Sequence, residues 1–263
     1  DLHSFPTRRS SDLQLGGMGS DEYLIRPGGG ETVIALDGDT ESTDTLRFGA
    51  GIGLEDLRLE KADGRAGKRS VSSDLVLRIG EGGQTVKLLN WYAVSADKRI
   101  DRFAFADGTT LSWQELLERK AVTSTANGTL VGNRELKGER LVVGAGATQV
   151  TLQAMGGDTV LDASQAADQA TLRGAEGQDL LIGSLAPNAT VSMAGGMGSD
   201  EYLIRPGGGQ TMIASDGDTE STDTLRFGEG IGLSDISLEK SGYDLIIRIG
   251  ESGQPAGDRK SVV

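Results

Sequence analysis

Two nine-residue stretches carry residue types and a spacing that could bind a hard metal ion. Both read Gly-Gly-Met-Gly-Ser-Asp-Glu-Tyr-Leu, at positions 16–24 and 195–203. The glycines let the backbone make a tight left-handed turn with uncovered carbonyl oxygens, and the aspartate adds a carboxylate. Sites built only from oxygen ligands suit calcium, so each stretch predicts a calcium-binding loop followed by a short strand. The predicted ligand residues are Gly16, Gly17, Gly19, Asp21, Gly195, Gly196, Gly198 and Asp200.

Further residues extend this predicted calcium chemistry. The stretch 174–182 is one residue away from the same pattern, and its candidate ligands are Gly174, Gly177 and Asp179. Asp158, Asp179 and Asp200 recur at intervals of 21 residues, so we expect them on the same side of successive coils, with Asp179 and Asp200 as the best pair of ligands.

An acidic loop at 37–44 recurs at 216–223. It can be interpreted as an irregular calcium site or as a solvated acidic turn, because it lacks the glycine and the final glutamate of an EF-hand loop. Its candidate ligands are Asp37, Asp39, Asp44, Asp216, Asp218 and Asp223.

The order of motifs after the first loop resembles a known family. The strings at 27–34, 44–49, 74–79, 90–92 and 99–109 follow the glycine loop in the order typical of the haemolysin-type calcium-binding-related module of RTX (repeats-in-toxin) proteins. The resemblance covers 14–120 well, 194 to about 254 as a shortened copy, and 121–193 loosely.

That resemblance implies a calcium-binding module of a large secreted bacterial protein, such as a toxin, an adhesin or an exoenzyme exported by type I secretion. It implies an extracellular or cell-surface location, calcium ions as partners and, for the parent protein, a host or bacterial surface. The 21-residue interval is longer than the regular repeat of the family, so we expect some metal sites to be incomplete or empty.

The chain divides into segments of different character. Residues 1–13 and 258–263 read like translated sequencing-adapter DNA at the two ends of a fragment, and we exclude them from the fold. Residues 16–61 and 195–240 align at a constant offset of 179, which indicates internal duplication. The expected organisation is therefore a first module copy at 14–120, degenerate coil repeats at 121–193, and a truncated second copy at 194–257.

Composition and net charge exclude some classes of partner and indicate the fold class. The net charge of −13 argues against nucleic acid or an anionic membrane as a partner and suits recruitment of divalent cations. The sequence has no cysteine for disulfides, no apolar run long enough for a transmembrane segment, 40 glycines and 4% aromatic residues. These features predict a turn-dense β protein.

The apolar pattern predicts which elements position the loops. In the first copy we expect strands at 22–25, 32–36, 45–48, 57–60, 75–79, 85–91 and 100–106. Asp107-Gly108 predicts a hairpin turn, and the capping box Ser112–Glu115 predicts one short helix at 113–119. Short runs of apolar residues recur about every ten residues between 130 and 193. They predict a strand in each half-turn of a parallel β-roll. The expected fold class is all-β: parallel β-roll or β-solenoid turns with an adjoining short β-strand module and one short helix.

We expect no catalysis from this chain. It has no cysteine, its single histidine is His3 in the excluded segment, and no carboxylate pair stands out among its many aspartates. Trp91, Tyr92, Phe103 and Phe105 could form either a ligand-binding face or the core. Two alternatives to a calcium-dependent module stay open at this point: a metal-independent adhesive or spacer solenoid, and a segment of a secreted carbohydrate-active enzyme.

Overall fold

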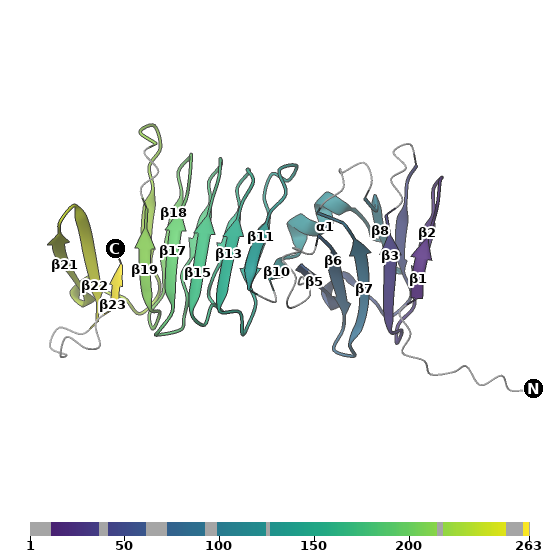
Figure 1. The fold of residues 1–263 in the computed structure, drawn as a ribbon, viewed down its shortest axis with the longest axis horizontal. Helices are drawn as coiled ribbons and strands as arrows, with labels where there is room; N and C mark the ends of the chain where they lie inside the picture. The colour runs from purple at the N-terminus through teal and green to yellow at the C-terminus, as the bar shows by residue number, and fades with distance from the viewer. Residues whose placement is uncertain are drawn as a thin grey trace, which may run out of the picture. The chain divides into compact units, whose positions relative to one another are not determined.

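The regular secondary structure of the described residues is mostly β-strand. The computed structural model describes residues 12–36, 42–61, 73–92, 99–124, 127–214, 218–250 and 260–262, and within them it has one α-helix, α1 (Trp113–Arg119) (Figure 1). Parallel coils stack into a β-solenoid, as the apolar pattern predicts. The chain forms two compact units, 1–120 and 121–263, which we describe separately.

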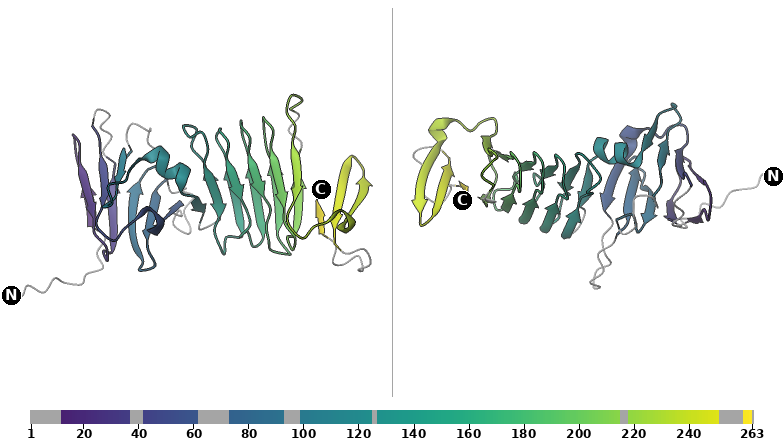
Figure 2. Two further views of the ribbon diagram at one scale, coloured as in Figure 1. Left: turned by 180° about the vertical axis from the view of Figure 1, so that it is seen from behind. Right: turned by 90° about the horizontal axis from the view of Figure 1, so that it is seen from above.

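Unit 2 is a stack of coils in which the chain alternates between two parallel sheets (Figure 2). One sheet contains β10 (Val122–Ser124), β12 (Arg140–Val143), β14 (Val160–Asp162), β16 (Leu180–Ile182), β18 (Glu201–Ile204) and β20 (Thr224–Phe227). The other contains β11 (Gly128–Val131), β13 (Gln149–Gln153), β15 (Gln169–Arg173), β17 (Thr190–Ala194) and β19 (Gln210–Ile213). Each of the short apolar runs lies in one of these strands, and successive runs lie in opposite sheets.

The register of the coils builds the core of unit 2. Leu161 pairs with Leu141 and Leu181 in the first sheet, and Leu172 pairs with Leu152 and Met193 in the second. Paired residues of parallel strands share a face, so these side chains form continuous buried columns between the sheets. Full burial of each such side chain contributes about 1.5–3 kcal/mol.

Unit 1 combines two parallel sheet segments with added antiparallel strands. One segment joins β1 (Asp12–Leu15), β3 (Glu31–Ala35) and β7 (Gln84–Leu89) in parallel, and β6 (Leu75–Ile79) and β5 (Leu57–Lys61) follow as an antiparallel hairpin. The other joins β2 (Glu22–Ile25), β4 (Thr45–Phe48) and β8 (Arg102–Ala104) in parallel, with β9 (Thr110–Ser112) antiparallel at its edge. A 3-10 turn, η1 (Leu54–Asp56), precedes β5.

The predicted helix and hairpin are confirmed. The Glu115 N–H donates to Ser112 Oγ at 3.2 Å, and the Ser112 N–H donates to Glu115 Oε2 at 2.8 Å, which completes the capping box of α1. Gly108, with φ 92°, makes the turn between β8 and β9 in a backbone region that favours glycine.

The aromatic residues of unit 1 form a core. Trp91 packs edge-on against Phe103 and Trp113, with ring centroids 6.3 Å apart in both pairs. The buried guanidinium of Arg99 lies over the rings of Trp91 and Trp113, and its Nε–H donates to the Trp91 carbonyl oxygen at 3.1 Å. Trp91, Phe103 and Phe105 are buried, so the core interpretation of these residues is correct and the binding-face interpretation is wrong.

Four of the seven strands expected in the first copy have different bounds in the structure. β3 begins and ends one residue earlier than expected, β5 ends one residue later, and the other two differ more. The strand expected at 85–91 ends at Leu89, because Asn90 has φ 57° and donates its N–H to Asp74 Oδ1 at 2.7 Å. The strand expected at 100–106 spans only Arg102–Ala104, because a turn begins at Phe105.

The second module copy repeats the strand pairing of the first. After β18, β19 and β20 come η3 (Leu233–Asp235), β21 (Ile236–Ser241) and β22 (Asp244–Ile249). Leu238 pairs with Ile247 in β21 and β22, as Leu59 pairs with Leu77 in β5 and β6. The last described strand, β23 (Lys260–Val262), pairs with both β19 and β22. Strands β1 and β23 include residues that the sequence assigns to the adapter segments.

Candidate metal centre

The candidate ligands lie where the chain enters the strands of the first sheet. The strand register places Asp179, Asp200 and Asp223 in one column, immediately before β16, β18 and β20. The column continues to Thr159 and Glu139, before β14 and β12. The sequence period therefore brings Asp179 and Asp200 into adjacent coils, as predicted.

These aspartates form a ladder of carboxylate–backbone hydrogen bonds, which we call the carboxylate ladder. The Thr159 N–H donates to Asp179 Oδ1 at 2.8 Å, and the Asp179 N–H donates to Asp200 Oδ1 at 2.8 Å. The Asp200 N–H donates to Asp223 Oδ1 at 3.0 Å. Each carboxylate thus caps the backbone of the preceding coil.

Unit 1 contains carboxylate–backbone hydrogen bonds of the same kind. The Asp21 N–H donates to Asp44 Oδ1 at 3.0 Å, and the Asp44 N–H donates to Asp101 Oδ2 at 2.7 Å. Asp101 was not among the predicted site residues, because no glycine loop precedes it. Its position directly before an apolar strand, like that of Asp44, is the sequence signal that identifies it.

The glycine loops fold against their own aspartates. A Cβ at Gly16, Gly174 or Gly195 would collide with an Oδ2 atom of Asp21, Asp179 or Asp200 respectively. In the loop before β16, the Ala175 N–H donates to Asp179 Oδ2 at 3.0 Å. The first glycine of each motif is therefore required because the carboxylate occupies the space of a side chain.

The two identical motifs have different surroundings. The Met197 N–H donates to the Ala175 carbonyl oxygen at 2.7 Å, and the Gly177 N–H donates to the Met197 carbonyl oxygen at 3.0 Å, so loop 195–200 stacks on loop 174–179. A Cβ at Gly196 or Gly198 would meet the backbone of that neighbouring loop. A Cβ at Gly17 or Gly19 would have no atom of the described residues within 4 Å. Stacking therefore distinguishes the second motif from the first.

The remaining candidates lie around this edge or outside the described residues. Asp158 is one position ahead of the column, and its Oδ1 accepts the Gln178 N–H at 2.9 Å. Asp218 accepts the Gly198 N–H at 3.1 Å and the Glu220 N–H at 2.9 Å, and these hydrogen bonds lower its pKa. Asp37, Asp39 and Asp216 lie outside the described residues.

Burial changes the ionisation of two column residues. The pKa of Asp179 is raised, mainly because burial disfavours its charged form; the hydrogen bonds from Thr159 and Ala175 oppose this, and the nearby charge of Asp158 adds to it. Burial raises the pKa of Glu139 to about 7, against the effect of the Asn133 N–H, which donates to Glu139 Oε1 at 2.8 Å. A cation placed near either carboxylate would favour the ionised form.

The donor chemistry of the loops suits calcium. The glycine motifs offer carboxylate and carbonyl oxygens, and the buried Asp21 Oδ2 has no hydrogen-bond partner among the described residues. Within that part of the chain, no group of three or more His, Cys, Asp or Glu side chains converges. A calcium ion at this edge would therefore need backbone carbonyls and water besides one or two carboxylates, since it takes 6–8 oxygen ligands.

Comparison with known families gives one match. Residues 74–115 match the model of the haemolysin-type calcium binding protein related domain. The matched segment runs from the start of β6 to the first turn of α1 and does not include the glycine loops. The curated proteins contain no significant match to the chain. No helix in the described residues is long and apolar enough to cross a membrane.

Proposed function

We propose that this chain is a non-catalytic β-solenoid module that folds or stiffens when it binds calcium, and that it belongs to a larger secreted protein. The observation that carries the proposal is the register that aligns Asp179, Asp200 and Asp223 beside stacked glycine loops at one edge of the coils. The likeness of residues 74–115 to a haemolysin-type calcium-binding-related domain supports the same metal.

Calcium would favour folding by neutralising the negative charge of the chain. The net charge is −13, and coiling brings carboxylates of successive turns close together. Their mutual repulsion opposes the compact state until a cation neutralises it. A metal that binds the folded coils and not the unfolded chain then stabilises the fold by mass action.

The parent protein is, on this proposal, an RTX-type toxin, adhesin or exoenzyme that leaves the cell by type I secretion. The chain would stay unfolded where calcium is scarce and coil outside the cell. Calcium ions would be its direct partners, and a host or bacterial surface would be the partner of the parent.

A second candidate is a metal-independent spacer solenoid. One observation favours it: both carboxylate oxygens of Asp179 already accept backbone hydrogen bonds, from Thr159 and Ala175. The adjacent loops are also joined directly through backbone hydrogen bonds of Met197. In this case the aspartates act only as caps of the coils.

Asp200→Asn separates the two candidates. An asparagine can still accept a backbone N–H, as Asn127 does from Thr148 at 2.9 Å, but it removes the charge that calcium needs. Far-UV circular dichroism of chelator-treated protein would be recorded while calcium is added, with magnesium as a control ion. The calcium module predicts a calcium-specific gain in β signal or thermal stability that Asp200→Asn weakens.

The matched control is Asp168→Asn, which makes the same charge change at an exposed position before β15. This variant should keep the full response to calcium. No calcium response in any of the three proteins would favour the spacer, and equal calcium responses in all three would place the calcium site away from Asp200.

A further inference from the structure

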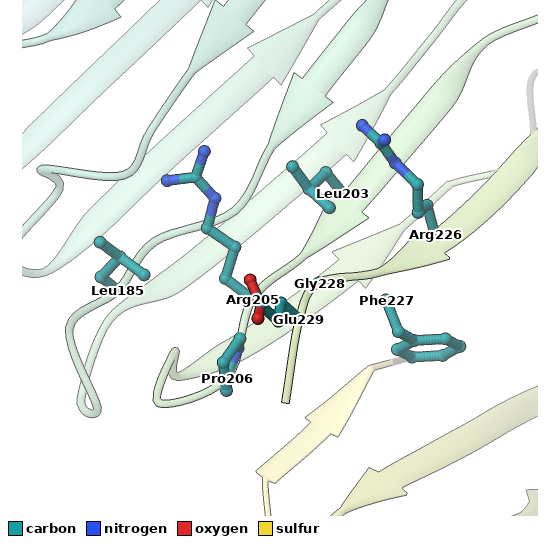
Figure 3. A pocket seen from close by; sticks show the side chains of 8 residues that line it. All are labelled: Leu185, Leu203, Arg205, Pro206, Arg226, Phe227, Gly228 and Glu229. Atoms are coloured by element: carbon teal, nitrogen blue, oxygen red, sulfur yellow. The ribbon is translucent and has the colours of Figure 1, made fainter. Parts of the chain in front are cut away.

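A surface pocket lies where the chain leaves strands β16, β18 and β20, at the opposite end of these strands from the carboxylate ladder. Its volume is about 490 Å³, which is within the range of small-molecule sites. Figure 3 shows the side chains that line it. We call it the arginine pocket, and its lining residues are Leu185, Leu203, Arg205, Pro206, Arg226, Phe227, Gly228 and Glu229.

The strand register places apolar and basic side chains of this pocket on the outer face of the first sheet. Tyr202 and Ile204 are buried, so Leu203 between them points outward. Leu203 pairs with Arg226 of β20, and paired residues of parallel strands share a face. In Figure 3 the guanidinium groups of Arg205 and Arg226 lie on either side of Leu203. The pocket therefore combines an apolar surface with two positive charges.

The two guanidinium groups have donors to offer to an anion. The Nε atom of Arg226 pairs with Glu201 Oε1, which holds the group in place, and a guanidinium has five N–H donors in all. Within the described part of the chain, Arg205 forms no ion pair. In a chain with a net charge of −13, this leaves an arginine without a carboxylate beside an apolar pocket.

The apolar part of the pocket is open to solvent. Leu185 follows β16 and is 48% exposed, and Leu203 is partly exposed. Pro206 adds further apolar surface in the turn after β18. A ligand that covers these side chains gains free energy from the apolar area that it removes from water.

The first module copy repeats the central arrangement. Leu24 pairs with Arg47 and is 42% exposed, although β8 pairs with β4 beyond Arg47. The turns after β4 and β20 are also alike, because a glycine N–H donates to a carbonyl oxygen of the neighbouring coil in each, from Gly49 at 2.8 Å and from Gly228 at 2.7 Å. An outward leucine beside an arginine is thus a feature of the coil, independent of what pairs with the outer edge of β20.

We propose that the arginine pocket binds a small amphiphilic carboxylate, that is, one carboxylate joined to an apolar chain. The carboxylate pairs with Arg205 and Arg226, since guanidinium groups bind carboxylates through parallel N–H donors. The apolar chain covers Leu185 and Leu203. Glu229 in the pocket lining opposes a second negative charge on the ligand, so the pocket favours monoanions. A fatty acid and the C-terminal leucine of a peptide share this chemistry.

Octanoate and N-acetyl-leucine are the probes that test the proposal. Each would be titrated into the full chain at constant calcium and followed by ligand-observed NMR. We expect saturable binding of at least one probe, and the tighter of the two identifies the source of the carboxylate. Binding should weaken by about tenfold in Arg205→Gln and in Leu185→Ser. Acetate lacks the apolar chain and octanol lacks the carboxylate, so each should bind more weakly than octanoate.

The matched control is Arg173→Gln, the same change at an exposed position of β15 in the other sheet. It should bind the probes like the intact chain, and circular dichroism would establish that all variants keep their β signal. The proposal is overturned if neither probe binds saturably, or if Arg205→Gln and Leu185→Ser bind like the intact chain. Octanol binding as tight as octanoate binding would also overturn it, because the arginines would then contribute nothing.

Discussion

At the scale of single residues, the aspartates of the solenoid act as caps of backbone N–H groups. Asp179 is 2% exposed and joins its own glycine loop to the preceding coil through two hydrogen bonds. Hydrogen bonds to charged groups contribute about 1.5–3 kcal/mol each, and a buried N–H group left without its acceptor costs about 1–3 kcal/mol. The carboxylate ladder therefore stabilises the coils irrespective of any metal.

Replacing Asp179 measures this contribution. Asp179→Ala should lower the free energy of unfolding by about 2–4 kcal/mol, because the Thr159 and Ala175 N–H groups lose their acceptor. Asp158→Ala should cost less, since Asp158 accepts one N–H, from Gln178. Urea unfolding in the presence of a chelator would give both values. Equal costs for the two variants would show that the ladder position has no special role.

Glu139 predicts a pH dependence. Its pKa is about 7 in the folded protein because burial disfavours the charge, against 4.5 as the ordinary value. Between these two values the folded state holds a proton that the unfolded state has lost, so stability falls as pH rises from 4.5 to 7. The total loss reaches about 3 kcal/mol.

Glu139→Gln should remove this loss and leave the acceptor for the Asn133 N–H. The variant should gain stability over the native chain as pH rises from 5 to 8, measured by urea unfolding at several pH values. Glu135→Gln, an exposed change in the same loop, is the control and should show no such gain. A gain that does not vary with pH would contradict the assignment of Glu139 as the titrating group.

At the scale of elements, the same glycine motif is under different steric constraints in its two copies, because the neighbouring loops differ. Gly198 and Gly19 hold the same place in identical sequences and have similar φ angles, 119° and 105°. A Cβ at Gly198 would meet the carbonyl oxygen of Gly177 in the adjacent loop, whereas a Cβ at Gly19 would meet no atom of the described part of the chain.

Gly198→Ala should therefore destabilise the protein more than Gly19→Ala. Both variants carry the cost of a left-handed conformation, roughly 1 kcal/mol, and only Gly198→Ala forces the stacked loops apart. Thermal unfolding of the two variants would measure the difference. Equal destabilisation would mean that loop stacking contributes little.

At the scale of the whole molecule, the sequence predicts the coils better than the sites. The strands between 121 and 193 could be predicted because short apolar runs and polar turns alternate in every half-turn. Helix α1 could be predicted because Ser112 and Glu115 form a capping box. The period of the apolar residues and the capping box are local features, so they can be recognised directly in the sequence.

The surroundings of each motif could not be predicted, because they depend on neighbours distant in the sequence. Identical loops at 16–21 and 195–200 differ in stacking, and identical hairpin pairings differ in burial. Arg99 is buried between two tryptophans, which its charge alone would not indicate. Asp101 joins the ladder without a glycine motif to mark it.

The most direct test of the central claim is the dependence of unfolding on calcium. Urea unfolding of the full chain would be measured at several free calcium concentrations, with magnesium in parallel. A calcium module predicts a free energy of unfolding that grows with calcium as binding to the folded state requires, by about 2.7 kcal/mol at a hundredfold excess over the dissociation constant. The same urea midpoint in calcium, magnesium and chelator would contradict the claim and leave the carboxylate ladder as a metal-independent device.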